Sequence, residues 1–279
     1  MTRTATPIGA HVSVAGGLAR ALARADAIGA EVLQVFVANT RAWAHPAEDR
    51  AGDEQFHATC TRPVFVHAPY LINFGSPSTD TLARSSRALD FSLRRAAAIG
   101  ARGVVVHAGS AVQGNRWVDA MHQVREHVLP VLDAAGGPPL LIEPTAGGGG
   151  ALASDAASLA AYLDVLGRSE RVGVCLDTCH IHAAGHDLST REWFAAALRA
   201  YGRAAGRGRI GLVHVNDSRD PTGSKRDRHT SIGAGTIGRD AFAALFTAQA
   251  TRGVPLVVET AEADHAADIA TLKQLRGVA

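Results

Sequence analysis

The stretch VGVCLDTCH at Val172–His180 predicts a buried strand that ends in chemically active side chains. Its first half is a short apolar run, β-branched at Val172 and Val174, as in strands buried on both faces. A carboxylate at the end of such a strand, here Asp177, is costly unless a cation pairs with it. Because Asp177 closes the strand, we expect it to share no helical turn with His180, so that the two serve neighbouring metal ions. Taken alone, the stretch favours a purely structural interpretation, in which Asp177 is ion-paired and His180 lies in a loop.

Working outward, similar apolar runs alternate with helical stretches along the chain. The predicted strands are Pro7–Val12, Glu31–Val37, Pro63–His67, Gly103–His107, Pro139–Glu143, Val172–Leu176, Ile210–Val215 and Pro255–Glu259. The predicted helices are Gly16–Ile28, Thr79–Ile99, Arg116–Ala134, Ser154–Leu166, Glu192–Ala205, Arg239–Ala250 and Asp264–Leu275, with a weaker one at Ala51–Cys60. Eight strand–helix repeats in this length predict a closed (β/α)8 TIM barrel, as a single domain over residues 1–279.

An open doubly wound sheet is the alternative fold. Its Gly-x-Gly-x-x-Gly fingerprint should follow the first strand, where the chain instead reads HVSVAGGLAR. The run GGGG at Gly147–Gly150 comes after the fifth strand, so it is a poor candidate for that fingerprint. The barrel is therefore the better prediction.

Seven of the eight predicted strands carry a His, Asp or Glu near their C-terminal ends. These residues are His11, His67, His107, Glu143, Asp177, His214 and Glu259. A barrel gathers these strand ends at one rim, where its active site lies. A lone strand-end His is more often a satisfied core residue, but seven such groups on one rim are hard to explain as packing. Imidazoles and carboxylates without an obvious thiolate suit zinc or manganese.

The segment after the seventh strand adds a second pair of candidate ligands. It reads HVNDSRDPTGSKRDRHTSIGAG, from His214 to Gly235, and contains Asp227 and His229. Its Gly, Ser and Arg content suits a phosphate-binding loop with its own metal ligands. An ordinary solvated polar loop fits the segment slightly better when it stands alone.

The composition excludes several classes of protein. The chain is 47% hydrophobic with a net charge of +2, so it has ample core residues and is not a polycation. No apolar run approaches the roughly 20 residues of a membrane helix, and the N-terminus lacks the apolar region of a signal peptide. Three cysteines are too few for a disulfide framework, which fits a reducing compartment. We expect a cytoplasmic protein with no membrane partner, and Cys175 buried in its strand.

Ordered motifs run along almost the whole chain and resemble one known family. They are GAHVS at Gly9–Ser13, VHAPYLIN at Val66–Asn73, IEPTAG at Ile142–Gly147, VCLDTCH at Val174–His180, HVND at His214–Asp217 and DRHTSIGAGTIG at Asp227–Gly238. This combination resembles the endonuclease IV family of abasic-site endonucleases, which are trinuclear zinc enzymes on a (β/α)8 barrel. The motif GAHVS alone would be weak evidence for this family, whereas DTCH followed downstream by DRH is specific to it.

The resemblance implies three Zn²⁺ ions per chain, with Mn²⁺ possible at one or more sites. The implied ligand sets are His67, His107 and Glu143 for the first ion; Asp177, His214 and Glu259, with Glu143 bridging, for the second; and His180, Asp227 and His229 for the third. Glu143 and Glu259 are the implied catalytic residues. His11 is expected near the site without being a ligand.

The resemblance also implies contacts to DNA. Arg41 and Tyr70 match positions that the family uses to probe the DNA beside the lesion, and Arg228 is a candidate phosphate contact. Two departures stand out. Pro144 replaces a common Asn after the bridging Glu, which puts the geometry around Glu143 in question. Ala111 replaces a further His of some relatives.

The implied activity is hydrolysis of the phosphodiester 5′ to an abasic site in duplex DNA, by three metals, leaving a 3′-hydroxyl and a 5′-deoxyribose phosphate. Removal of 3′-blocking groups is expected as well, by a protein acting as a monomer. Two alternatives remain. A sugar isomerase or epimerase on a similar barrel would need one or two metals and a small closed pocket. A non-catalytic protein that binds damaged DNA would need no metal cluster.

Overall fold

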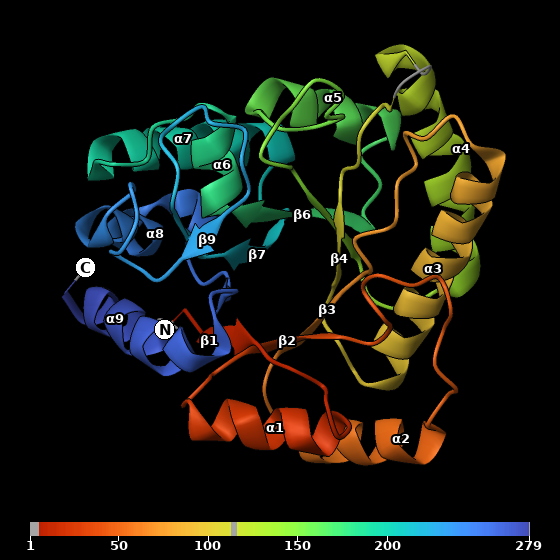
Figure 1. The fold of residues 1–279 in the computed structure, drawn as a ribbon, viewed down its shortest axis with the longest axis horizontal. Helices are drawn as coiled ribbons and strands as arrows, with labels where there is room; N and C mark the ends of the chain where they lie inside the picture. The colour runs from red at the N-terminus through yellow and green to blue at the C-terminus, as the bar shows by residue number, and fades with distance from the viewer. Residues whose placement is uncertain (1–5, 113–115, 279) are drawn as a thin grey trace.

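The computed structural model describes residues 6–112 and 116–278, and it contains a closed barrel of parallel strands (Figure 1). Each strand pairs with its neighbours in the order β1-β10-β7-β6-β5-β4-β3-β2. The strands are β1 (Ile8–His11), β2 (Leu33–Phe36), β3 (Val64–His67), β4 (Val104–His107), β5 (Leu140–Glu143), β6 (Val172–Asp177), β7 (Ile210–His214) and β10 (Leu256–Val258). The predicted fold is confirmed, and every predicted strand is found to within two residues at either end.

Helices surround the barrel. They are α1 (Leu18–Ala27), α2 (Arg50–Thr59), α3 (Thr79–Ala98), α4 (Trp117–Ala135), α5 (Ala156–Val165), α7 (Arg191–Ala205) and α9 (His265–Val278), the last preceded by η3 (Glu262–Asp264). The predicted helix Arg239–Ala250 is wrong as one element, because it is broken into η1 (Arg239–Ala243), α8 (Ala244–Thr247) and η2 (Gln249–Thr251). The buried Thr251 hydroxyl donates to the Leu245 carbonyl, which a continuous helix would have used for its own ladder.

A short helix that the sequence did not predict follows β6 without a loop. It is α6 (Thr178–Ala184), and Asp177 is its N-cap, accepting a hydrogen bond of 2.9 Å from the His180 backbone N–H. The expectation that Asp177 and His180 share no helical turn is therefore wrong. A short Asp side chain can close a strand and cap the next helix at once.

The predicted polar loop after β7 is also more ordered than expected. Its two ends form the antiparallel strands β8 (Asp217–Ser218) and β9 (His229–Thr230). This pairing lies beside α6, so that the segment carrying Asp227 and His229 folds back over the end of the barrel (Figure 1).

The barrel interior is filled by one cluster of side chains, in which glycines on neighbouring strands leave room for Leu141. The cluster consists of Val32, Phe65, Val105, Leu141, Cys175, Leu212 and Val257. A Cβ added at Gly211 would lie 2.9 Å from Leu141, and one at Gly173 would lie 2.8 Å from it. Cys175 is fully buried, as predicted. Among the described helices, none is long and apolar enough to cross a bilayer.

Candidate metal centre

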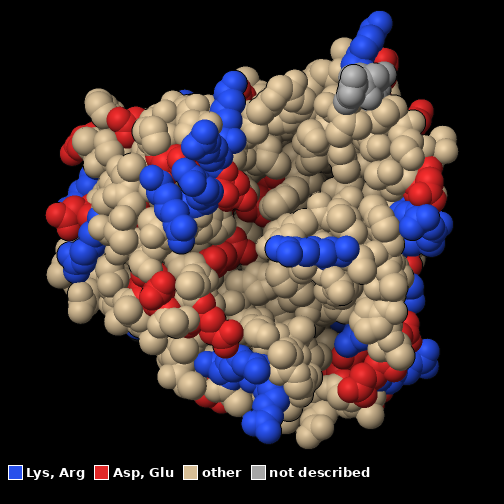
Figure 2. All heavy atoms as spheres, viewed as in Figure 1, with Lys and Arg blue, Asp and Glu red and all other residues tan. Residues whose placement is uncertain are grey.

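The strand ends place the predicted side chains around one hollow. His67, His107, Glu143, Asp177 and His214 are the last residues of β3 to β7, and Glu259 follows β10 directly. Figure 2 shows the hollow in the middle of this face, with acidic atoms in its wall. The innermost cavity has a volume of about 170 Å³ and is lined by His67, Tyr70, His107, Glu143, His180, Asp227, His229 and Glu259.

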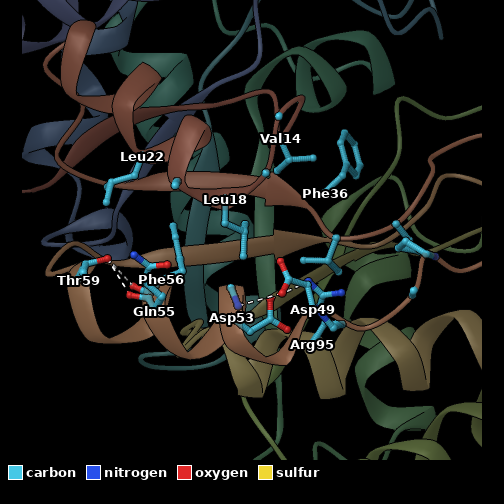
Figure 3. A pocket seen from close by; sticks show the side chains of 18 of the residues that line it. Val14, Leu18, Leu22, Phe36, Asp49, Asp53, Gln55, Phe56, Thr59 and Arg95 are labelled. Carbon is cyan, nitrogen blue, oxygen red and sulfur yellow. Dashed lines mark hydrogen bonds and ion pairs between the residues drawn. The ribbon is translucent and has the colours of Figure 1, made fainter.

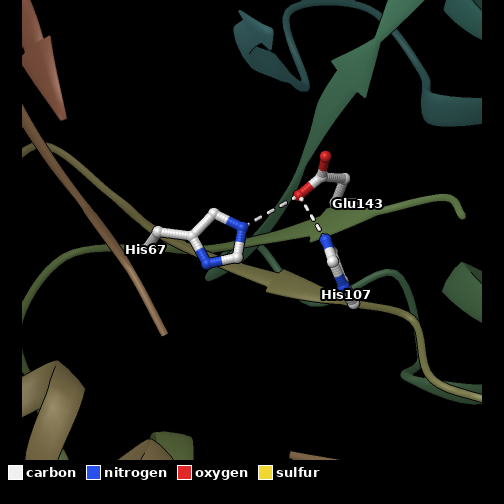
Figure 4. A group of neighbouring side chains, drawn as sticks. All are labelled: His67, His107 and Glu143. Carbon is white, nitrogen blue, oxygen red and sulfur yellow. Dashed lines mark hydrogen bonds and ion pairs between the residues drawn. The ribbon is translucent and has the colours of Figure 1, made fainter. Parts of the chain in front are cut away.

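The first group of possible ligands is His67, His107 and Glu143 (Figure 4). Glu143 Oε2 lies 3.3 Å from His67 Nε2 and 3.4 Å from His107 Nε2. His67 Nδ1 is 2.7 Å from the Ala68 carbonyl and donates to it, which leaves the Nε2 lone pair facing the carboxylate. The backbone carbonyl that follows β3 directly therefore sets the tautomer that a metal requires.

The second group shares Glu143 and adds Asp177, His214 and Glu259. The other oxygen of Glu143, Oε1, lies 3.0 Å from His214 Nδ1, and Glu259 Oε2 lies 3.2 Å from the same nitrogen. The two oxygens of Glu143 thus face different groups. That arrangement suits a carboxylate that bridges two cations.

The third group is His180, Asp227 and His229. His180 Nε2 lies 3.2 Å from Asp227 Oδ2, and His229 Nε2 lies 2.8 Å from Asp227 Oδ1. His180 Nδ1 is 3.0 Å from the carbonyl of Pro144 and donates to it. Pro144 has no N–H to offer, but its carbonyl fixes the tautomer of His180 and leaves Nε2 free for a ligand role.

Two residues outside the predicted set hold the second group in place. Gln34 is fully buried on β2; its Oε1 accepts from His214 Nε2 at 2.9 Å, and its Nε2 donates to Glu259 at 2.9 Å. Asn216 donates to Asp177 at 2.7 Å and accepts from the Glu259 backbone N–H. A polar residue inside an apolar strand, as in LQVF, was the available signal for Gln34.

Asp217 organises the segment that carries the third group. Its buried carboxylate accepts backbone hydrogen bonds from five residues further along the chain: Ser218, Gly233, Gly235, Ile237 and Gly238. These bonds close the loop on both sides of Asp227 and His229. Asp217 is therefore a positioning residue for the third group.

The electrostatics of the site fit divalent cations. Burial alone would raise the pKa of Glu143, but the positive charges of His214 and His107 outweigh it and hold the pKa well below its ordinary value. Burial likewise opposes the charge on His214, yet its negatively charged neighbours hold its pKa well above the ordinary value. His229 Nε2 lies between two carboxylates, 2.8 Å from Asp227 Oδ1 and 3.6 Å from Asp177 Oδ2. In the metal-free protein, protons on these imidazoles supply the positive charge that cations would supply, so the donor set fits zinc or manganese.

Cys179 lies beside the third group. Its sulfur, with Asp177 and His229, forms a further set of potential ligand atoms within 4.8 Å of one another. Burial raises the pKa of the Cys179 thiol to about 12, so the group is a neutral thiol at pH 7.

The predicted DNA-contacting residues lie around the hollow and differ in exposure and in ion pairing. Tyr70 is half exposed, with its ring 5.2 Å from that of His67 and 5.5 Å from that of His107. Arg41 is exposed on the loop between β2 and α2. Arg228 forms two hydrogen bonds with Asp220, so part of its charge is already neutralised. Basic side chains gather beside the hollow over the segment between β8 and β9 (Figure 2).

Two further cavities open on the same end of the barrel. One, of about 430 Å³, adjoins the metal centre through Tyr70 and His107 and is walled by the glycines of residues 147–150. The other, of about 640 Å³, lies between α1 and α2 and contains the Asp53–Arg95 ion pair of 2.7 Å (Figure 3). None of the described residues that line this larger cavity also lines the innermost cavity, so it is separate from the metal centre.

Known proteins resemble the chain over nearly its full length. Residues 22–275 match the family model described as a xylose isomerase-like TIM barrel. A Streptomyces coelicolor protein named probable endonuclease 4 is 50% identical, over 97% of this chain and 95% of its own length. The crystal structure of endonuclease IV from Thermus thermophilus matches with a TM-score of 0.84 at 33% identity, over 96% of this chain and 99% of its own. A D-tagatose 3-epimerase-like protein, at 17% identity and a TM-score of 0.76 over 98% of each chain, shares the fold alone. The chain therefore belongs to the endonuclease IV family of xylose isomerase-like TIM barrels.

Proposed function

We propose that the protein is a DNA-repair endonuclease that hydrolyses the phosphodiester 5′ to an abasic site in duplex DNA. The products would be a 3′-hydroxyl and a 5′-deoxyribose phosphate, and 3′-blocking groups would be removed at the same centre. The observation that carries the proposal is the convergence of nine imidazole and carboxylate side chains into three groups at one rim of the barrel. The names of its relatives as endonucleases support the same reaction class.

The three groups would hold three divalent cations, zinc or manganese. His67, His107 and Glu143 would bind the first; Glu143, Asp177, His214 and Glu259 the second; and His180, Asp227 and His229 the third. Such cations neutralise charge on a phosphodiester and make water a nucleophile at neutral pH.

The protein's own residues would orient the reactants. Burial alone would raise the pKa of Glu259, but the charge on His214 and the hydrogen bond with His11 outweigh it and lower the pKa, so its carboxylate is ionised at pH 7. Gln34 holds Oε1 of this carboxylate, and Glu259 also lines the innermost cavity. There it would accept a hydrogen bond from the attacking water and direct the oxygen toward the phosphorus.

Lesion recognition would rest on the lack of a base. An abasic nucleotide costs less to extrude than a paired one, because there is no base to unstack. Tyr70, half exposed above His67 and His107, would fill the vacated stack together with Arg41. Bacteria keep their DNA in the cytoplasm, so a repair enzyme with bacterial relatives would act there, and we expect it to act as a monomer.

The test is cleavage of end-labelled duplex DNA that carries one abasic analogue unable to undergo β-elimination. A single cut on its 5′ side, with an extendable 3′-hydroxyl, is the expected result for metal-loaded protein. Glu143→Gln should abolish the cut, because one neutral amide cannot serve two cations. Near-normal cleavage by this variant would contradict the assignment of Glu143.

The same assay separates the proposal from its alternatives. A non-catalytic binding protein would slow the migration of abasic duplex DNA in a native gel and leave the strand intact. A sugar epimerase would ignore DNA and interconvert free sugars. Either result, from protein shown to carry its metals, would overturn the proposed function.

A further inference from the structure

A cavity with distinctive chemistry lies at the end of the barrel opposite the metal centre. Its volume is about 530 Å³, and four arginines line it: Arg199, Arg203, Arg207 and Arg252. Strand β7 begins at this cavity with Ile210 and ends at the metal centre with His214. The two sites are therefore separated by the length of a strand, about 3.3 Å per residue.

The four arginines differ from many others in the chain because no described carboxylate neutralises them. Within the described residues, their guanidinium groups form no hydrogen bond or ion pair, and no Asp or Glu lines the cavity. By contrast, Arg95 pairs with Asp53 at 2.7 Å and Arg276 with Glu31 at 2.6 Å. All four are exposed and therefore solvated, but four cations without a carboxylate partner still make the cavity electropositive, which favours a bound anion.

The helix dipole explains only part of this cluster. Arg203 lies in the last turn of α7, where a cation offsets the partial negative charge of the helix terminus. That effect falls off within one turn, so it does not account for Arg199, one turn earlier. Nor does it account for Arg252, which comes from the segment before β10. The cavity gathers cations from separate elements.

The wall between the arginines is apolar. Ile210, Val254 and Ala250 line it, and a Cβ at Gly202 would lie only 2.8 Å from the Ala250 Cβ. Glycine at 202 thus lets η2 pack closely against α7 and shapes the cavity. Its volume lies in the range of small-molecule sites, about 300–1,000 Å³.

Planar guanidinium groups match phosphate oxygens in pairs, and an apolar wall matches a flat ring. We propose that this cavity binds a nucleoside phosphate, with the phosphates on the arginines and the ring system on the apolar wall. The site does not depend on the proposed function of the metal centre. Free nucleotides and the 5′-phosphorylated end of a nucleic acid share this chemistry.

The test is calorimetric titration of the metal-loaded protein with ADP, pyrophosphate and adenosine. ADP should bind more tightly than either of the others, because only ADP engages both the arginines and the apolar wall. The double variant Arg203→Ala/Arg252→Ala should weaken ADP binding at least about tenfold, since charge-assisted hydrogen bonds are lost. The matched control Arg87→Ala/Arg102→Ala, which removes exposed arginines elsewhere, should bind ADP as the wild type does.

Three results would overturn the proposal: no ADP binding at millimolar concentration, ADP binding unchanged in the double variant, or pyrophosphate binding as tight as ADP. The second would indicate that the phosphates bind at the metal centre. A 5′-phosphorylated tetranucleotide identifies the source of the ligand. If it binds more tightly than ADP and loses affinity in the double variant, the site takes a nucleic-acid end; the reverse order indicates a free nucleotide.

Discussion

The carboxylate of Asp217 occupies the space that a side chain at position 235 would need. A Cβ at Gly235 would lie 2.4 Å from Asp217 Oδ1, and the Gly235 backbone N–H donates to Oδ2 at 3.2 Å. The two residues are 18 positions apart, and the segment between them carries Asp227 and His229. Their close approach explains how a long polar segment presents two ligands at a fixed place.

Asp217→Asn should selectively weaken the third metal group. The amide would turn an N–H toward backbone donors, leaving buried groups unsatisfied at a cost of about 1–3 kcal/mol. We expect the measured metal content to fall from three ions per chain to two, and backbone hydrogen exchange to become faster in the segment between Asp217 and Gly235. The exposed Asp240→Asn is the control. Retention of three tightly held ions would contradict the role of Asp217.

Gln34→Leu should weaken metal binding by the second group, although Gln34 itself is not a ligand. The change removes the acceptor of His214 Nε2 and the donor to Glu259. Loss of such a partner typically reduces metal affinity by about 10–100-fold. Competition with a chromophoric chelator measures the effect. Gln55→Leu, an exposed change on α2, should leave the affinity unaltered; an equal loss in both variants would exclude a specific role for Gln34.

The sequence was sufficient for the barrel because each strand is a local apolar run closed by a polar residue. The structure also brings His67, His107 and Glu143 together as the resemblance implied, since strand ends must meet at one rim. Gln34 could not be assigned in this way. It contacts His214 across 180 positions of sequence, and that contact depends on which side chains face inward after the barrel closes.

The two errors in the predicted helices, the broken segment Arg239–Ala250 and the missed α6, had a different origin. Hydroxyl groups that bond to their own backbone, such as Thr251 to Leu245, compete with the helix ladder in a way that a hydrophobic pattern does not reveal. The same holds for α6, where the capping bond of Asp177 decides that a helix starts directly after a strand. Such side-chain-to-backbone hydrogen bonds leave no periodic pattern in the sequence, so a hydrophobic pattern could not predict them.

Metal loading at neutral pH should release protons. Burial lowers the pKa of His229, but Asp177 and Asp227 outweigh it and raise the pKa to about 9, so the metal-free imidazole is protonated at pH 7. A cation must displace that proton, so metal affinity should rise with pH until the imidazole is neutral, above a pH of about 9. Calorimetry of zinc binding in buffers of different ionisation enthalpy counts the protons. A count of zero at pH 7 would contradict the raised pKa.

Arg41→Ala with Tyr70→Ala should weaken binding to abasic duplex DNA without removing metal. Stacking of an aromatic ring on a base contributes about 1–3 kcal/mol, so the dissociation constant should rise about tenfold or more. Fluorescence anisotropy measures the affinity, and metal analysis checks that the ions remain. Trp193→Ala removes an exposed ring on α7 as the control. Affinity unchanged by the double variant would reject the contact.

The packing of Leu141 inside the barrel can be tested by a double-mutant cycle. Leu141→Ala should destabilise the protein by about 2–5 kcal/mol, because it leaves a cavity among buried side chains. Gly211→Ala should also destabilise it, by about 1–3 kcal/mol, since the three atoms nearest to the new Cβ all belong to the Leu141 side chain, the first at 2.9 Å. In the Leu141→Ala background that clash is gone, so Gly211→Ala should cost little. Denaturant unfolding of the four proteins measures the coupling free energy. Additive costs would show that Gly211 is glycine for a reason other than room for Leu141.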